Sequence, residues 1–194
     1  MRRRRRRPPA SVTARVHLLH AGYARSPSVG SSITYIEDGD VRIVMDPGMV
    51  ADRQTHILEP LADLGVAPES ITHVVLSHHH PDHTMNIALF HEAWVIDFWA
   101  RYKHDQWLGH DGDGWAVGPS SRIWLTPGHT DQDISLIVDA EEGVHAMTHL
   151  WWKEDRTPEV DPYATQPDAL IANRERVLEV ADIVIPGHGP AFRT

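Results

Sequence analysis

Cysteine is absent from the 194 residues of this chain. The absence excludes disulfide bonds, zinc sites built on thiolates and a cysteine nucleophile. Any metal ion must therefore be held by histidine and carboxylate side chains, and the chain has 15 histidines and 27 acidic residues to offer. Hydrophobic residues make up 41% of the sequence, which at this length predicts one domain with a sizeable core.

Long apolar runs are also missing, since no segment approaches the roughly 18 consecutive apolar residues of a membrane-spanning helix. The chain opens with the arginines of residues 2–7 and the pair Pro8-Pro9, a composition that predicts a disordered tail over residues 1–10 ahead of a domain over residues 11–194. The stretch that follows the arginines is too polar for a secretory signal. We therefore expect a soluble, cytoplasmic protein with no membrane contact.

Basic residues are scarce outside that tail. The net charge is −9, and leaving out the six arginines gives 12 basic against 27 acidic residues, or −15 for the rest of the chain. An acidic body repels phosphate backbones. A small-molecule substrate is therefore the expected partner, and nucleic acid is not.

A dense histidine cluster follows a short β-branched, apolar run at residues 72–77, which predicts a buried strand. The residues after this strand are His78, His79, His80, Pro81, Asp82 and His83. Imidazole nitrogens and carboxylate oxygens are ligands that a cation such as zinc accepts. The spacing H-x-H-x-D-H, with His79 as the spacer, predicts a metal site at the end of this strand.

Two further strands end in a glycine turn that carries a histidine. The strand at residues 122–126 runs into Pro127-Gly128-His129, and the strand at 183–185 runs into Pro186-Gly187-His188. A hairpin over residues 32–45 ends at Asp46, and another over residues 133–148 is followed by His149. Ligands delivered by several strand ends are typical of a catalytic metal site.

Helical spacing of apolar residues predicts helices over residues 52–64 and 167–181 and a short one over 84–90. Residues 22–30 have the composition of a turn-rich loop, and no strand or helix is predicted for residues 97–121. Trp94, Trp99 and Trp107 are expected in the core or in a pocket wall, and His145 in a structural role. The chain thus has two halves, each with strands and a helix, which fits an α/β fold with a four-layer α/β/β/α sandwich.

The motif of His78, His80, Asp82 and His83 resembles that of the metallo-β-lactamase fold superfamily of hydrolases, in particular its small single-domain, glyoxalase-II-like members. The resemblance implies two neighbouring metal sites. His78, His80 and His129 match the first, and Asp82, His83 and His188 match the second. It also implies that Asp46 lies near the metals and orients a ligand histidine.

His149 departs from the family pattern. At the end of the strand at residues 144–148, members of the superfamily usually place an aspartate that bridges the two metals. A carboxylate can bind two cations at once, whereas a neutral imidazole offers one lone pair. His149 is therefore expected to be a terminal ligand, which leaves either a weaker second metal or a single occupied site.

The resemblance implies hydrolysis by a metal-activated hydroxide, with Asp82 orienting the nucleophile or carrying its proton. Zinc, as one or two Zn²⁺ ions, is the expected cofactor, with iron and manganese as alternatives. An ester, thioester or lactone is the expected substrate. The alternatives are phosphodiester or RNA cleavage, iron-dependent sulfur dioxygenase chemistry, and a non-catalytic metal-binding relative.

Overall fold

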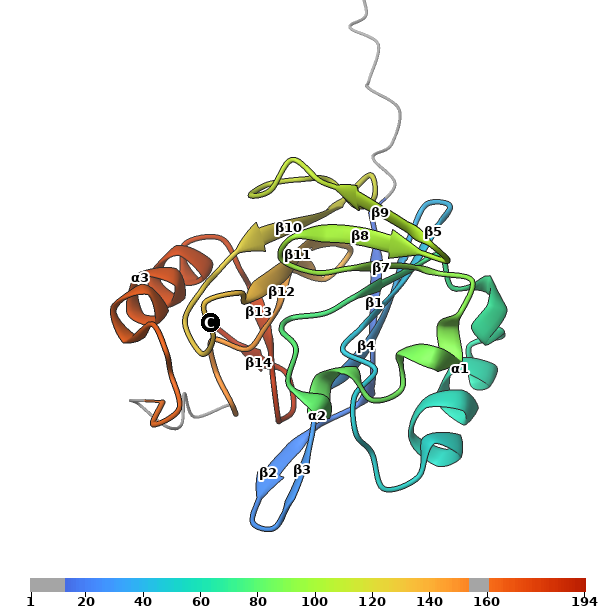
Figure 1. Cartoon of the computed structure of the whole chain (residues 1–194), viewed down its shortest axis with the longest axis horizontal. Helices are drawn as coiled ribbons and strands as arrows, with labels where there is room; N and C mark the ends of the chain where they lie inside the picture. The colour runs from blue at the N-terminus through green and yellow to red at the C-terminus, as the bar shows by residue number, and fades with distance from the viewer. Residues whose placement is uncertain (1–12, 154–160) are drawn as a thin grey trace, which may run out of the picture.

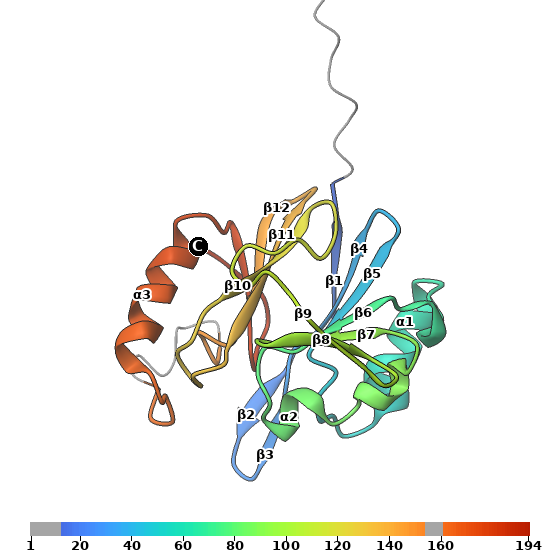
Figure 2. The same ribbon diagram turned by 45° about the horizontal axis from the view of Figure 1, so that its top comes forward.

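Two β-sheets pack face to face in the computed structural model, which describes residues 13–153 and 161–194 (Figure 1). The predicted tail at residues 1–10 lies outside the described residues. Helix α1 (Glu59–Asp63) covers the outer face of one sheet, and helix α3 (Pro167–Leu178) covers the outer face of the other (Figure 2). The four layers confirm the predicted α/β/β/α sandwich.

The first sheet has seven strands in the order β1-β4-β5-β6-β7-β8-β9. Their bounds are β1 (Arg15–His20), β4 (Ile33–Asp38), β5 (Val41–Met45), β6 (His73–Val75), β7 (Trp94–Ile96), β8 (Ala100–Lys103) and β9 (Gln106–Gly109). β5, β6 and β7 are parallel to one another, and the other pairs are antiparallel. β4 and β5 form the predicted hairpin, which turns at Gly39 with a φ of 65°.

The second sheet has five strands in the order β10-β11-β12-β13-β14. Their bounds are β10 (Ser121–Leu125), β11 (Ile134–Ala140), β12 (Gly143–Thr148), β13 (Ile183–Pro186) and β14 (Phe192–Arg193). β12 and β13 are parallel, because α3 connects them. Between β1 and β4 the chain forms the separate hairpin of β2 (Tyr23–Arg25) and β3 (Ser28–Gly30), which projects from one end of the sandwich (Figure 1).

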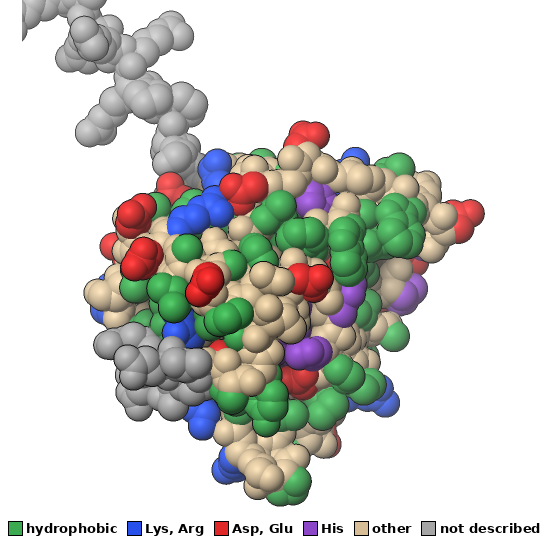
Figure 3. Space-filling model, turned by 60° about the vertical axis from the view of Figure 1, so that its left-hand side comes forward, with side chains coloured by type: hydrophobic (Ala, Val, Ile, Leu, Met, Phe, Trp, Pro, Cys, Tyr) green, Lys and Arg blue, Asp and Glu red, His purple; other side chains and the backbone are tan. Residues whose placement is uncertain are grey.

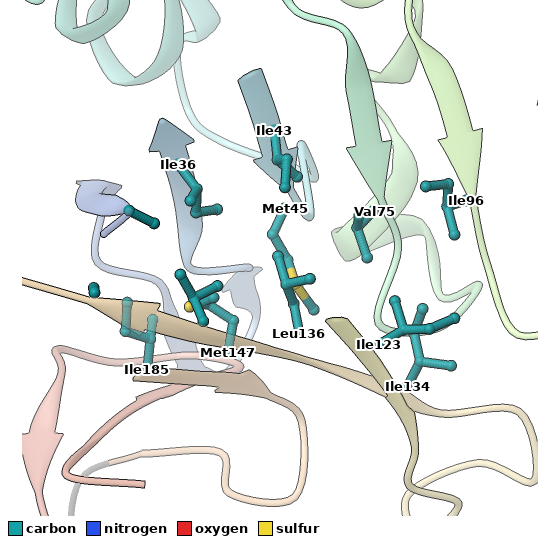
Figure 4. Close-up of a cluster of buried hydrophobic side chains, with 13 residues drawn as sticks. Ile36, Ile43, Met45, Val75, Ile96, Ile123, Ile134, Leu136, Met147 and Ile185 are labelled. Carbon is teal, nitrogen blue, oxygen red and sulfur yellow. The ribbon is translucent and has the colours of Figure 1, made fainter. Parts of the chain in front are cut away.

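Three apolar clusters hold the layers together, and the alternation of side chains along each strand assigns residues to them. On β4, Ile36 faces the other sheet, whereas Tyr35 faces the helical layer beside β5 and β6. On β13, Ile185 faces the inter-sheet core and Val184 faces α3. Figure 4 shows the central cluster, in which Ile36, Ile43, Met45, Val75 and Ile96 of one sheet meet Leu136, Met147, Ile185, Ile123 and Ile134 of the other.

The helices differ from the predicted ranges at their ends. The segment predicted at 52–64 is a π-helical turn, η1 (Gln54–Leu58), that continues into α1, and Gly65 ends it with a φ of 73°. The helix predicted at 84–90 is instead α2 (Pro81–Thr84) followed by the 3-10 turn η3 (Ile87–Phe90). The remaining 3-10 turn is η2 (Pro68–Ser70). α2, η2 and α3 begin with a proline, and α1 has one at its second position; a proline in the first turn needs no N–H partner and so allows a helix to begin there.

Three sequence expectations are wrong. Residues 22–30 form the β2–β3 hairpin instead of a loop, and residues 97–121 contain β8 and β9. Trp99 and Trp107 are 52% and 71% exposed, so they lie neither in the core nor in the wall of the site. β9 is the exposed edge strand of the first sheet, where Trp107 packs against Tyr102 with ring centroids 4.8 Å apart.

Candidate metal centre

The carboxyl ends of β5, β6, β10, β12 and β13 lie at the same edge of the sandwich. β5 and β6 are parallel in one sheet, while β12 runs parallel to β13 and antiparallel to β11 in the other, which gives β10 the same direction as β12. The loops that leave these strands carry the predicted metal-site residues, and all of them come together: His78, His80, Asp82, His83, His129, His149 and His188. On the face drawn in Figure 3, histidine side chains lie beside acidic and hydrophobic ones.

Asp46 joins two of these loops. Its Oδ1 accepts a hydrogen bond of 2.7 Å from the Ser77 N–H, and its Oδ2 lies 2.8 Å from Nδ1 of His83. Asp46 has a φ of 53°, a left-handed conformation that is uncommon outside glycine and is often found at functional sites. Next to it, Gly48 packs directly on the backbone carbonyl of Asp82, where no Cβ would fit. The carboxylate therefore orients His83, as the family resemblance implied.

His78, His80 and His129 turn three ring nitrogens toward one point. His80 Nδ1 lies 3.0 Å from His78 Nε2 and 3.2 Å from His129 Nε2. The opposite nitrogen of His78, Nδ1, lies 2.9 Å from the Ser77 hydroxyl. Three imidazoles arranged in this way could hold one cation and leave a fourth position open.

Asp82, His83 and His188 form a second such group. Asp82 Oδ2 lies 3.5 Å from His83 Nε2 and 3.6 Å from His188 Nε2. Nδ1 of His188 donates a hydrogen bond to the backbone carbonyl of Gly30 at 3.0 Å, so the lone pair of the ring is on Nε2. Nε2 of His83 is buried and has no hydrogen-bond partner among the described residues. An unpartnered nitrogen in that position fits a bound cation.

His149 lies between the two groups. It is 2% exposed, and its ring centroid lies 4.2 Å from that of His129 and 4.9 Å from that of His83. Its Nε2 is 3.0 Å from Nε2 of His188, and its Nδ1 is buried without a described partner. Gly187 makes room for the ring, since a Cβ there would lie 2.9 Å from His149 Nε2. An imidazole thus occupies the central position of the cluster.

The environment keeps most of these histidines neutral. Burial, together with the neighbouring imidazoles, holds the pKa of His78 and of His149 well below the ordinary value. Burial likewise lowers the pKa of His188 to about 4. Burial alone would lower the pKa of His83, but the charge and hydrogen bond of Asp46 raise it. Neutral imidazoles have a free lone pair, which a metal ligand requires.

Asp161 is a site residue that the sequence analysis missed. It is 4% exposed, and its Oδ2 lies 2.6 Å from His129 Nδ1. The same oxygen accepts from the indole N–H of Trp152 at 3.0 Å, and Oδ1 accepts from the Tyr163 N–H at 2.9 Å. Asp161 lies in an irregular, charged segment that belongs to no motif, so no sequence signal distinguished it from the other acidic residues nearby.

A cavity of about 340 Å³ opens beside the histidines. Its lining consists of Ala24, Val29, His80, Asp82, His129, His149, Trp152, Tyr163 and His188. Trp152 and Tyr163 stack almost in parallel, with ring centroids 5.7 Å apart and an interplanar angle of 2°. A second groove of about 320 Å³ shares Ala24 and His188 with this cavity and is lined by Arg25 and Lys153. Both open spaces lie against the β2–β3 hairpin.

The sequence profile of the metallo-beta-lactamase superfamily matches residues 27–192, which include every residue of the cluster. The chain belongs to this superfamily. It is 32% identical over 191 residues to "Metallo-beta-lactamase domain-containing protein 1" of Xenopus laevis, an alignment that covers 92% of this chain and 81% of the relative. Membership confirms the predicted family, and with it an enzyme of that superfamily.

Solved structures of the superfamily share this fold. A Thermotoga maritima protein assigned to the metallo-beta-lactamases superposes with a TM-score of 0.73 at 19% identity, covering 94% of this chain and all of that one. A quorum-quenching N-acyl homoserine lactone hydrolase superposes with a TM-score of 0.68 at 18% identity, covering 92% and 93% of the two chains. At these identities, the superpositions establish the four-layer architecture.

None of the helices in the described residues is both long and apolar enough to span a membrane.

Proposed function

We propose that this metallo-beta-lactamase-fold protein is a metal-dependent hydrolase of an ester, thioester or lactone. The observation that carries the proposal is the convergence of two ligand groups at the floor of one cavity. Each group could hold one cation, and both border the same 340 Å³ space through His80, Asp82, His129 and His188. A metal site beside a pocket that can admit a small molecule is the expected arrangement of a hydrolytic centre.

In this proposal His78, His80 and His129 hold one ion, and Asp82, His83 and His188 hold the other, with His149 between them. Three imidazoles are the ligand set of an open tetrahedral zinc site, so we assign zinc to the first group. His149 can give its Nε2 to one ion only, because its ring has one lone pair on that side. The second ion is therefore the weaker one.

Bound zinc would lower the pKa of an attacking water toward about 7 and polarise the substrate carbonyl. The chain supplies the rest. Asp82 borders the cavity and lies within 3.6 Å of His188 Nε2, where its carboxylate can hold the attacking water and accept its proton. Asp46 fixes the orientation of His83 behind it, through the contact of 2.8 Å with Nδ1.

The shape of the cavity supports a substrate with an apolar or planar part. Trp152 and Tyr163 form one stacked wall, and Val29 of the β2–β3 hairpin belongs to the same lining. Aromatic faces of this kind bind apolar and planar groups. The lactone hydrolase that shares the fold acts on an N-acyl homoserine lactone, which combines an acyl arm with a hydrolysable ring.

The test combines metal analysis with a substrate panel. We expect protein purified without added metal to contain zinc, and to hydrolyse simple aryl esters, thioesters and lactones in a reaction that chelator abolishes and Zn²⁺ restores. The Asp82→Asn variant should retain zinc at the first group and lose turnover. Iron in place of zinc would favour the oxygenase alternative, and a zinc-loaded protein inactive on the whole panel would contradict the proposal.

Phosphodiester hydrolysis is the second candidate, because one observation favours it. Arg25 and Lys153 line a groove that meets the cavity at His188, and its lining includes no acidic residue from the part of the chain that the structure describes. Two cations beside the metal centre of an otherwise acidic chain would suit an anionic substrate. Bis(4-nitrophenyl) phosphate tests this directly. Turnover of the diester above that of the esters, lost in the Arg25→Ala, Lys153→Ala double variant, would make this the leading function.

A further inference from the structure

The two ligand groups are supported from behind in the same way. In each group, one imidazole uses its inner nitrogen to contact a buried carboxylate that lies outside the group. Asp46 does this for His83 at 2.8 Å, and Asp161 does it for His129 at 2.6 Å. Both carboxylates are 4% exposed. Asp46 follows β5 in the first sheet, whereas Asp161 belongs to the loop before α3, so the two arise independently.

Charge is distributed unevenly between the groups. The second group includes the carboxylate of Asp82, whereas the first consists of imidazoles alone. His149 adds a further neutral ring at the centre. Among the described carboxylates, Asp161 is one that directly contacts a member of the first group, His129.

We propose that Asp161 is the positioning residue of the first metal group and supplies the negative charge that His149 does not. By accepting from Nδ1–H, it would fix the His129 tautomer with the lone pair on Nε2, the atom that faces His80 at 3.2 Å. A charged acceptor also makes the imidazole a stronger donor to a cation. The inference rests on the proposed metal centre.

Asp161 also has a donor atom within 4.8 Å of donor atoms of His129 and His149, but its hydrogen bonds favour the positioning role over direct ligation. Oδ2 lies within hydrogen-bond distance of both His129 Nδ1 and the Trp152 indole N–H, and Oδ1 accepts from the Tyr163 N–H. Oδ2 is therefore already shared between two N–H groups. Trp152 also links the carboxylate to the stacked wall of the cavity.

Zinc affinity, measured by chelator competition on the full chain, tests the inference without requiring a substrate. Asp161→Asn keeps the shape and removes the charge, and should weaken the tighter ion by about 10- to 100-fold. The matched control is Trp152→Phe, which removes the other side-chain donor to the same oxygen and retains an aromatic ring. It should change that affinity by less than about threefold. In a His149→Asp background, Asp161→Asn should cost clearly less than in the wild type.

Three outcomes would overturn the inference. Zinc affinity of Asp161→Asn within about threefold of the wild type would mean that the carboxylate acts on the fold alone. A loss of zinc affinity in Trp152→Phe equal to that in Asp161→Asn would mean that the effect comes from the aromatic wall of the cavity and not from the carboxylate. An equal loss of zinc affinity in the wild-type and His149→Asp backgrounds would show that Asp161 does not compensate for the charge that His149 lacks. A wild type that binds no zinc at all would instead refute the proposed metal centre, and the inference with it.

Discussion

Replacing His149 by aspartate changes the central side chain of the cluster from a neutral ring to an anion. His149 is 2% exposed, and its ring lies within 4.9 Å of the rings of His83, His129 and His188. A carboxylate in this place can bind both cations at once. We therefore expect the second ion, at Asp82, His83 and His188, to bind more tightly in His149→Asp than in the wild type.

The size of the effect follows from two opposing contributions. A unit negative charge about 4 Å from a divalent cation contributes about 8 kcal/mol of attraction at an effective dielectric constant near 20. Burying that carboxylate, and losing an imidazole, offsets several kcal/mol of this gain. A net gain of about 3 kcal/mol is a reasonable expectation, and corresponds to roughly a 100-fold lower Kd for the second ion.

The assay is calorimetric titration of Zn²⁺ into the metal-free wild type and the His149→Asp variant. His149→Asn is the matched control, because asparagine has the shape of aspartate without its charge. Thermal unfolding adds a second readout. Without metal, the buried carboxylate should lower the Tm of His149→Asp, and with saturating zinc the order should reverse, since a ligand that binds only the folded state stabilises it.

Equal affinities for the second ion in the wild type and His149→Asp, or tighter binding in the wild type, would refute this reasoning. His149 would then be a fully competent ligand of a site built around an imidazole. A gain of the same size in His149→Asn would assign the effect to the space left by the ring and not to charge.

Three further predictions test separate parts of the structure. Gly187→Ala places a Cβ 2.9 Å from His149 Nε2 and should weaken the second ion at least about tenfold, whereas Gly109→Ala, with open space around it, should leave zinc titrations unchanged. Burial, with Arg101 and Lys103, lowers the pKa of His73 from 6.5 to about 4, so the unfolded chain binds a proton there before the native one does as the pH falls. Stability should therefore decrease as the pH falls from about 6.5 to about 4. In urea unfolding, the free energy of unfolding of His73→Gln should change with pH by about 1 kcal/mol less than that of the wild type, after allowance for partial exposure. Leu136→Ala opens a cavity in the inter-sheet core, where the side chain is fully buried, and should lower the free energy of unfolding by about 3 kcal/mol in the same assay.

Local patterns in the sequence were enough to predict most of the fold and the proposed ligands. Short β-branched runs ending in glycine or histidine located β6, β10 and β13, because a buried strand must be apolar and the turn after it must reverse tightly. The proposed ligands in the loop after β6 could be recognised by the spacing H-x-H-x-D-H. Asp46 was visible as well, since it directly follows the hairpin of β4 and β5.

Features that depend on partners distant in the chain were missed or misplaced. β8 and β9 pair at the edge of a sheet, where one face needs no apolar side chains, so their sequence resembles a loop. The aromatic Trp107 suggested burial, yet its place on that edge strand leaves it 71% exposed. Sequence alone could not distinguish these outcomes, because exposure depends on what packs against the strand.

The sequence by itself determined which residue types are available for chemistry: histidines and carboxylates without cysteine, with an imidazole where the resemblance implies a bridging carboxylate. Only the tertiary structure decided which carboxylate supports which imidazole. Asp161 lies 32 positions from His129, and contacts it at 2.6 Å because the loop before α3 folds back over the end of β10. Such a contact has no periodicity and no motif, since it is created by packing two distant loops at one edge of the sandwich.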